Sequence, residues 1–204
     1  MSADAERLVL VFDTETTGLT LHPDAPLAKQ PKIIELGAAL VDGSGRVVEE
    51  FSQTVNPGEP LSAEITKITG LRDEDLADAP RFAEVLPQLR HIFAQAAAVF
   101  AHNLPFDRSM LRYELARAGV ADFPWPAGEF CTVGLHRAQW GRNPKLTELY
   151  AATLGRPLPQ THRALDDVLA LVEVIVALDL QRLALEVPSE QEASNDVAAA
   201  AHQD

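Results

Sequence analysis

Residues 9–18, VLVFDTETTG, open with an apolar run and end in two carboxylates one residue apart. The run Leu8–Phe12 predicts a buried strand. Because side chains alternate along a strand, Asp13 and Glu15 are expected on one side of it and Thr14 on the other. Two adjacent carboxylates at the end of a buried strand repel each other and are poorly solvated. A divalent cation that prefers oxygen ligands, Mg²⁺ or Mn²⁺, would remove both costs, whereas a solvated strand end would explain the pair without an ion.

The rest of the chain predicts three strands joined by a hairpin, followed by strands that helices separate. The further strands are expected at residues 32–42, 46–55, 97–101 and 129–133, and the hairpin turn at Asp42–Gly45, DGSG. The helices are expected at residues 62–70, 80–95, 105–119, 145–155 and 162–181. This order predicts an α/β fold in which helices cover a five-stranded mixed sheet.

Two later segments, residues 101–111 and 161–172, place further acids at predicted helix starts. In the first, AHNLPFDRSML, Asp107 falls in the first turn of a helix. In the second, THRALDDVLALV, His162 opens a helix, and Asp167 lies at the head of its apolar stripe. Taken singly, Asp107 is an ordinary acid at a helix N-terminus and His162 is a capping or surface histidine. An acid on the apolar side of a helix needs a partner, and a cation is one such partner.

Taken together, the motifs FDTETTG, AHNLPFD and HRALDD resemble the DEDDh family of 3′-to-5′ exonucleases. This family includes the proofreading epsilon subunit of bacterial replicative DNA polymerases, RNase T and oligoribonuclease. The resemblance covers about residues 8–180 and implies an RNase H-like three-layer fold. The matching residues occur in the family order: Asp13, Glu15, Asp107, His162 and Asp167.

The resemblance also implies a reaction. Asp13, Glu15, Asp107 and Asp167 would hold two divalent cations, Mg²⁺ or Mn²⁺, and His162 would take a proton from the attacking water. The enzyme would release nucleoside 5′-monophosphates from single-stranded 3′ ends, with DNA favoured over RNA, in a proofreading, repair or degradation role, with a polymerase or repair protein as partner. The alternatives are an RNA-trimming exonuclease like oligoribonuclease or RNase T, and a catalytically silent module that binds nucleic-acid ends or a polymerase.

Family-type contacts with the substrate are expected next to these motifs. Backbone or hydroxyl groups would bind the terminal nucleotide, one apolar side chain would separate the last two bases, an aromatic ring would stack, and a histidine would approach the phosphate. The apolar and aromatic residues could equally be ordinary core residues. The residues concerned are Thr14, Thr16, Thr17, Leu19, Phe106 and His102. Two departures stand out: Thr69 where many relatives have histidine, and a long Pro-rich link, residues 20–32.

The net charge of −13 over 204 residues argues against a broad basic surface that coats nucleic acid. Cys131 is the only cysteine, the chain start lacks a signal-peptide pattern, and no apolar stretch is long enough to cross a membrane, so a cytoplasmic protein is expected. The domain is expected at residues 7–182, between a flexible start at 1–6 and a disordered acidic tail at 183–204. A small phosphate-binding patch could form from Arg108, Arg112, Arg142, Lys145 and Arg163.

Overall fold

The computed structural model describes residues 7–159 and 162–186. Its five strands form one sheet in the order β3-β2-β1-β4-β5. The central strand β1 is antiparallel to β2 and parallel to β4, which is in turn parallel to β5, and β3 is antiparallel to β2. The predicted mixed sheet is therefore confirmed. The strands are β1 (Leu8–Thr16), β2 (Ile33–Asp42), β3 (Val47–Thr54), β4 (Ala96–Ala101) and β5 (Gly128–Cys131).

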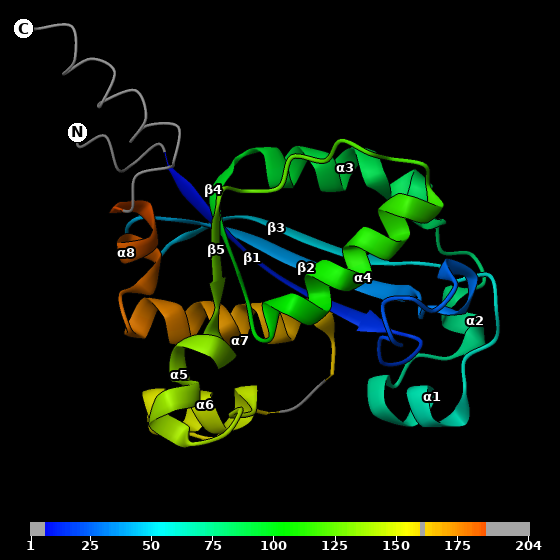
Figure 1. Ribbon diagram of the computed structural model, residues 1–204. Coiled ribbons are helices and arrows are strands. Elements are labelled where there is room, and N and C mark those ends of the chain that lie inside the picture. The colour runs from blue at the N-terminus through cyan, green and yellow to red at the C-terminus, as the bar shows by residue number, and fades with distance from the viewer. Residues whose placement is uncertain (1–6, 160–161, 187–204) are drawn as a thin grey trace, which may run out of the picture.

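Helices cover both faces of this sheet and produce three layers (Figure 1). Helices α3 and α4 cover one face, whereas α7 and α8 cover the other, and α6 packs against α7. No helix among the described residues is long and apolar enough to cross a bilayer. The helices are α1 (Ala63–Thr69), α2 (Asp73–Leu76), α3 (Phe82–Ala94), α4 (Leu104–Arg117), α5 (Thr132–Trp140), α6 (Leu146–Leu154), α7 (Ala164–Ala177) and α8 (Leu180–Glu186).

Alternation along β1 divides the core between the two faces of the sheet. Leu10 and Phe12 belong to the cluster that α3 and α4 complete, while Val9 and Val11 belong to the cluster that α7 and α8 complete. At the end of the strand, the same alternation directs Asp13 and Glu15 to the α7 face and Thr14 to the α4 face.

The predicted helix 162–181 is wrong in its C-terminal part. Helix α7 ends at Ala177, and a separate helix, α8, begins at Leu180. Between them, Asp179 has a φ of 54°, a left-handed backbone conformation that cannot continue a right-handed helix. The expected domain boundary at residue 182 falls inside α8, whose Ala184 and Leu185 are buried. The expected flexible start, 1–6, and the rest of the expected tail, 187–204, lie outside the described residues.

A second difference concerns the predicted strand 129–133. Strand β5 ends at Cys131, and Thr132 and Val133 instead begin α5, a helix that the sequence pattern did not predict. The Cys131 Sγ accepts a hydrogen bond from the backbone N–H of Gly134 and caps the helix. Two consecutive β-branched residues favour a strand locally, so the burial of Thr132 and Val133 overrides their intrinsic preference.

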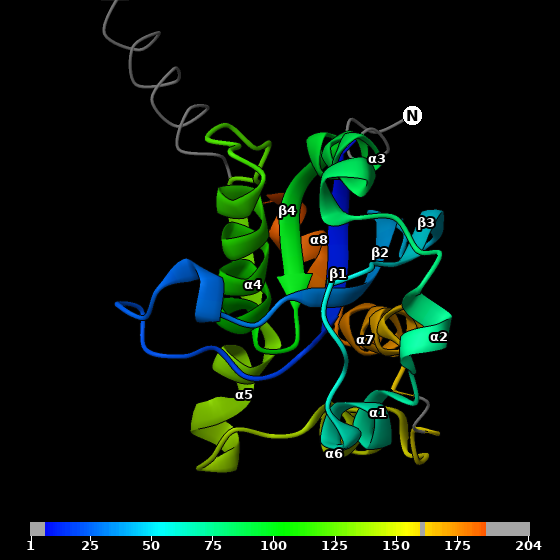
Figure 2. The ribbon, with the colours of Figure 1, turned by 90° about the vertical axis from the view of Figure 1, so that its right-hand side faces the viewer.

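The Pro-rich link, residues 20–32, forms a hydrogen-bonded loop that projects from the body of the protein beside α4 (Figure 2). Its base is closed by two hydrogen bonds, from the Thr17 N–H to the Lys32 carbonyl at 2.8 Å and from the Lys32 N–H to Thr17 Oγ1 at 2.9 Å. From α4, the Arg117 guanidinium donates to the carbonyls of Leu27, Gln30 and Pro31. These contacts hold the loop against the end of α4.

Candidate active site

Three carboxylates meet where the end of β1 faces the first turn of α7. One carboxylate oxygen from each of Asp13, Glu15 and Asp167 lies within 4.8 Å of one from each of the others. Asp13 and Glu15 share a face of β1, and Asp167 comes from the N-terminal turn of α7. The donors are all carboxylate oxygens, which fits a hard divalent cation such as Mg²⁺ or Mn²⁺.

A glycine allows α7 to approach the sheet closely at this point. Gly37 lies opposite Asp13 in the register of β1 and β2. A Cβ at Gly37 would lie 2.4 Å from the carbonyl carbon of Ala164 and 2.5 Å from the nitrogen of Leu165. Since no side chain could fit there, the backbone of α7 rests directly on the backbone of β2. This close contact brings Asp167 next to the carboxylates of β1.

Asp107 reaches the site from the first turn of α4 and is only 2% exposed. Its Oδ1 accepts hydrogen bonds from the backbone N–H of Thr14 at 3.1 Å and from Thr14 Oγ1 at 2.8 Å. Thr14 therefore links α4 to the strand that carries Asp13 and Glu15. Its hydroxyl group donates to Asp107, in agreement with its direction towards the α4 face.

Burial raises the pKa of all four carboxylates, and the charges of neighbouring acids add to it for Asp13, Glu15 and Asp167. Burial, followed by the charges of Asp107, Glu15 and Asp167, raises the pKa of Asp13 well above its ordinary value. Burial and the neighbouring acids raise the pKa of Glu15 to about 7. Burial raises the pKa of Asp107 to about 7 against the opposing effect of its bonds from Thr14. Burial also raises the pKa of Asp167, which the nearby His162 opposes. A bound cation would relieve this repulsion.

His162 lies immediately before α7, two residues from its first residue, Ala164. Its φ of 51° places it in the left-handed region, which is uncommon for a residue other than glycine. The charge of His162 lowers the pKa of Asp167, which places the two side chains near each other. The structure thus brings all five predicted residues to one end of the sheet.

Of the residues predicted to contact the terminal nucleotide, two threonines are hydrogen-bonded within the chain, whereas Leu19 and Phe106 differ in how far they are exposed. The hydroxyls of Thr16 and Thr17 make bonds within the chain: Thr16 Oγ1 donates to the Gly18 carbonyl, and Thr17 Oγ1 accepts from the Lys32 N–H. Leu19 is 81% exposed, so the interpretation that it belongs to the core is wrong. Phe106 is partly buried against the core that α3 and α4 complete, which agrees with a packing role and leaves part of its ring accessible.

His102 connects the loop after β4 to the neighbouring helix α5 and to the loop before α6. Its Nδ1 lies 2.9 Å from Thr132 Oγ1 and its Nε2 lies 3.1 Å from the carbonyl of Pro144. A carbonyl only accepts, so Nε2 donates and Nδ1 accepts from the Thr132 hydroxyl. Burial lowers the pKa of His102, which favours this neutral form. Both ring nitrogens already have partners within the chain.

The expected phosphate-binding patch is largely neutralised by acids. Arg108 pairs with Glu129 at 2.7 Å, and Arg142 pairs with Glu148 at 2.6 Å. Arg163 pairs with Glu35, which is buried in β2. Sequence reasoning missed Glu35, although a single acid inside the apolar run KIIELGAAL was a usable signal. Thr69, at the position where many relatives have histidine, is buried and donates to the Ile65 carbonyl.

Comparison with other sequences identifies relatives over most of this chain. A model of the RNase_T exonuclease family matches residues 10–175. The PolC-type DNA polymerase III of Caldanaerobacter subterraneus is 33% identical over 190 residues, which cover 92% of this chain and 13% of that protein. The PolC-type DNA polymerase III of Bacillus cereus is 32% identical over 174 residues, which cover 85% of this chain and 11% of that protein. This chain therefore spans about an eighth of the length of these polymerases.

Solved structures share the fold. The nuclease domain of 3′hExo, described as a DEDDh family member bound to rAMP, superposes with a TM-score of 0.69 at 17% identity, covering 89% of this chain and 96% of that one. Exonuclease X in complex with 5′-overhanging duplex DNA superposes with a TM-score of 0.61 at 25% identity, covering 91% of this chain and 98% of that one. These structures confirm the expected RNase H-like arrangement of a mixed sheet between helices.

Proposed function

The chain belongs to the RNase_T exonuclease family, and from this premise we propose that it removes nucleotides one at a time from the 3′ end of single-stranded nucleic acid. The observation that carries the proposal is the convergence of Asp13, Glu15 and Asp167 within 4.8 Å, with Asp107 joined to the same strand through Thr14. A cluster of mutually repelling, partly buried acids is costly unless a cation is bound, and phosphodiester hydrolysis is a reaction that such cations assist.

The four carboxylates would hold the divalent cations, Mg²⁺ or Mn²⁺. When bound there, two cations would favour deprotonation of the attacking water and stabilise the negative charge on the leaving oxygen. Asp13 lies among the other acids, whose charges raise its pKa, and the resemblance to the DEDDh family supports it as a ligand of the cations. Glu15 and Asp167 would hold a cation together with Asp13, and Asp107, which is joined to the same strand through Thr14, would complete the set of ligands.

His162 would take the proton from the water that attacks the last phosphodiester. The water oxygen forms a bond to phosphorus as the bond from phosphorus to the 3′ oxygen breaks. The products are a nucleoside 5′-monophosphate and a strand that is shorter by one nucleotide and ends in a 3′-hydroxyl. Leu19, four residues beyond Glu15 and 81% exposed, would contact the last bases, and the accessible part of Phe106 would contact the terminal nucleotide.

We propose DNA as the preferred substrate because several of the sequence relatives are DNA polymerases in which such a segment is a small part of the chain. A polymerase or a repair protein is the corresponding proposed partner. RNA trimming is the second candidate, which the fold shared with the nuclease domain of 3′hExo bound to rAMP favours.

The product pattern tests this proposal. The protein is incubated with 5′-labelled single-stranded DNA or RNA of one sequence, with Mg²⁺, with Mn²⁺ or with EDTA. We expect a ladder that shortens from the 3′ end, that EDTA abolishes, and that is faster on DNA.

A matched pair of variants on α7 controls this experiment. Asp167→Asn removes a carboxylate that faces the site, whereas Asp166→Asn removes the exposed acid next to it. We expect the first variant to be inactive and the second to retain full activity. Intact label on both strands with both metals would contradict the exonuclease and favour a module that binds ends without cleaving them.

A further inference from the structure

Glu35 is an acid inside an otherwise apolar strand, and the proposed reaction does not use it. It is 1% exposed and lies opposite Glu15 in the register of β1 and β2. A buried carboxylate requires a partner, because removing a charge from water without compensation is strongly unfavourable. Its position beside the acidic cluster means that this partner also affects the electrostatics and the geometry of the site.

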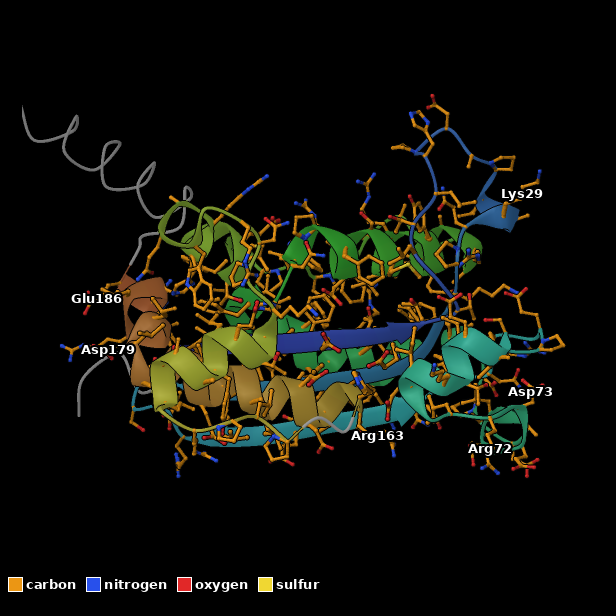
Figure 3. All side chains as sticks on the ribbon, turned by 90° about the horizontal axis from the view of Figure 1, so that it is seen from below. Lys29, Arg72, Asp73, Arg163, Asp179 and Glu186 are labelled. Carbon is orange, nitrogen blue, oxygen red and sulfur yellow. The ribbon has the colours of Figure 1, made fainter. Side chains whose placement is uncertain are left out.

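The partners of Glu35 are two consecutive residues at the start of α7. Its Oε1 accepts from the Nε of Arg163 at 2.9 Å and from the second guanidinium nitrogen, Nη2, at 2.7 Å. Its Oε2 accepts from the backbone N–H of Ala164 at 3.1 Å. One side chain from β2 therefore binds both the side chain of the residue before α7 and the first backbone N–H of the helix. Figure 3 shows Arg163 at this end of α7, next to α1 and α2.

These contacts lie between two residues of the proposed machinery. His162 directly precedes Arg163 in the chain and has a φ of 51°. Asp167 follows one turn later, and its backbone N–H donates to the carbonyl of Arg163 at 3.1 Å. Fixing Arg163 and Ala164 to β2 thus fixes the backbone that directly follows His162 and the helical turn that carries Asp167.

We propose that Glu35 and Arg163 are positioning residues that hold His162 and Asp167 against the carboxylates of β1. The contacts of Glu35 with Arg163 and Ala164, here called the clamp, act together with the close backbone contact at Gly37. The glycine sets how near α7 lies to β2, and the ion pair sets the position of α7 along the strand. Arg163 is half-exposed, with 49% of its side chain accessible, yet its Nε and Nη2 are both directed to Glu35. This inference rests on the proposed exonuclease function.

The test compares Glu35→Gln, Arg163→Lys and the double variant Glu35→Gln/Arg163→Met in the full chain. Three quantities are measured: kcat and KM on single-stranded DNA, the Kd for Mn²⁺ by calorimetry, and Tm. Residues that orient metal ligands affect metal affinity or activity by about 10- to 100-fold. We expect Glu35→Gln to lower kcat and weaken Mn²⁺ binding by about this factor, with KM changed less than about threefold, and Arg163→Lys to retain part of both.

The double variant separates positioning from stability. Glu35→Gln leaves the half-exposed Arg163 guanidinium without its carboxylate partner, and the double variant removes that unpaired charge as well, so Tm should recover towards the wild-type value. We expect kcat to stay low in the double variant, because the clamp is still absent. A double variant that regains both Tm and kcat would overturn the proposal and show a purely stabilising ion pair. Unchanged kcat and Mn²⁺ affinity in folded Glu35→Gln would overturn it as well.

The far end of the same strand provides a matched control. Arg46 pairs with Asp42 of β2 at 3.1 Å, in the hairpin away from the site. We expect Arg46→Met to leave kcat and Mn²⁺ binding unchanged. The two proposals fail in distinguishable ways. A wild-type protein that cleaves no strand contradicts the exonuclease function. An active wild type whose Glu35 and Arg163 variants keep the same kcat and Mn²⁺ affinity contradicts only the positioning role.

Discussion

Asp13 is the residue on which the electrostatics of the site converge. Burial and the charges of Asp107, Glu15 and Asp167 all raise its pKa. In the metal-free protein this carboxylate is therefore a source of instability, and only a bound cation makes its charge favourable. Residues with such opposed effects on stability and activity are typical of functional sites.

Asp13→Asn should stabilise the metal-free protein while it abolishes cleavage. The amide keeps the shape of the side chain and removes one of the charges that repel each other. We expect the free energy of unfolding, measured by urea at pH 8 with EDTA, to rise by about 1–2 kcal/mol. With Mg²⁺ present the difference should shrink or reverse, since the wild type alone retains the full set of ligands. A lower stability of Asp13→Asn in EDTA would contradict the assignment of Asp13 to a repulsive cluster.

At the scale of elements, the contact between α7 and β2 determines whether the site forms. Gly37 lies where the helix backbone touches the strand, and the nearest atoms to an added Cβ belong to the backbone rather than to a flexible side chain. Such atoms cannot move without shifting the helix. The same contact explains why a glycine interrupts the apolar run of β2.

Gly37→Ala should therefore displace the start of α7. We expect it to lower the free energy of unfolding by about 1–3 kcal/mol, as overpacking does, and to reduce kcat through the shifted Asp167. Gly18→Ala is the matched control for stability, because an added Cβ there meets nothing within 4 Å. Its unfolding free energy should stay within about 0.5 kcal/mol of the wild type. Equal stability of Gly37→Ala and the wild type would show that α7 does not rest on β2 in this way.

At the scale of the whole molecule, the acidic cluster links folding to pH and to metal. The pKa values of Glu15 and Asp107 both rise to about 7 on folding. The folded protein consequently holds protons that the unfolded chain has already released above about pH 4.5. The contribution of these two groups to the free energy of unfolding of the metal-free protein must then fall as the pH rises towards 7, and it levels off above that pH.

Urea unfolding at pH 5.5 and pH 8 in EDTA tests this linkage. We expect the free energy of unfolding to be lower at pH 8 by about 1–2 kcal/mol, a range that allows for the partial exposure of Glu15. Saturating Mg²⁺ should restore more stability at pH 8 than at pH 5.5, because ligands must be deprotonated to bind. The double variant Glu15→Gln/Asp107→Asn should show a smaller difference between the two pH values. Stability that rises from pH 5.5 to pH 8 in EDTA would contradict the raised pKa values.

We expect helix α8 to belong to the folded unit, and two truncations test this. Ala184 and Leu185 are buried in the cluster that β1 and α7 share, and the Leu185 carbonyl accepts a hydrogen bond from Arg7 at 2.6 Å. A chain that ends after Arg182 loses these contacts, whereas a chain that ends after Glu186 keeps them. We expect the shorter chain to be less stable by about 2–4 kcal/mol, the cost of losing a buried leucine and its neighbour. Equal Tm values would support the predicted domain boundary at residue 182.

The sequence by itself determined the features that depend on local pattern. Apolar runs, alternation and turn residues located β1 to β4 and the hairpin at Asp42–Gly45. The resemblance of three motifs to the DEDDh family predicted Asp13, Glu15, Asp107, His162 and Asp167 as the site residues. Periodicity reports which face of an element is apolar, so it failed where packing opposed local preference, as at Thr132 and Asp179.

Only the tertiary structure decided which distant residues meet. Glu35 and Arg163 are separated by 128 positions in the chain, and Thr14 and Asp107 by 93. No local periodicity encodes such a pair, because it depends on how closely α7 and α4 pack on the sheet. The acids themselves could therefore be predicted from the sequence, while their convergence into one site depends on the packing of two helices, α4 and α7, against the end of β1.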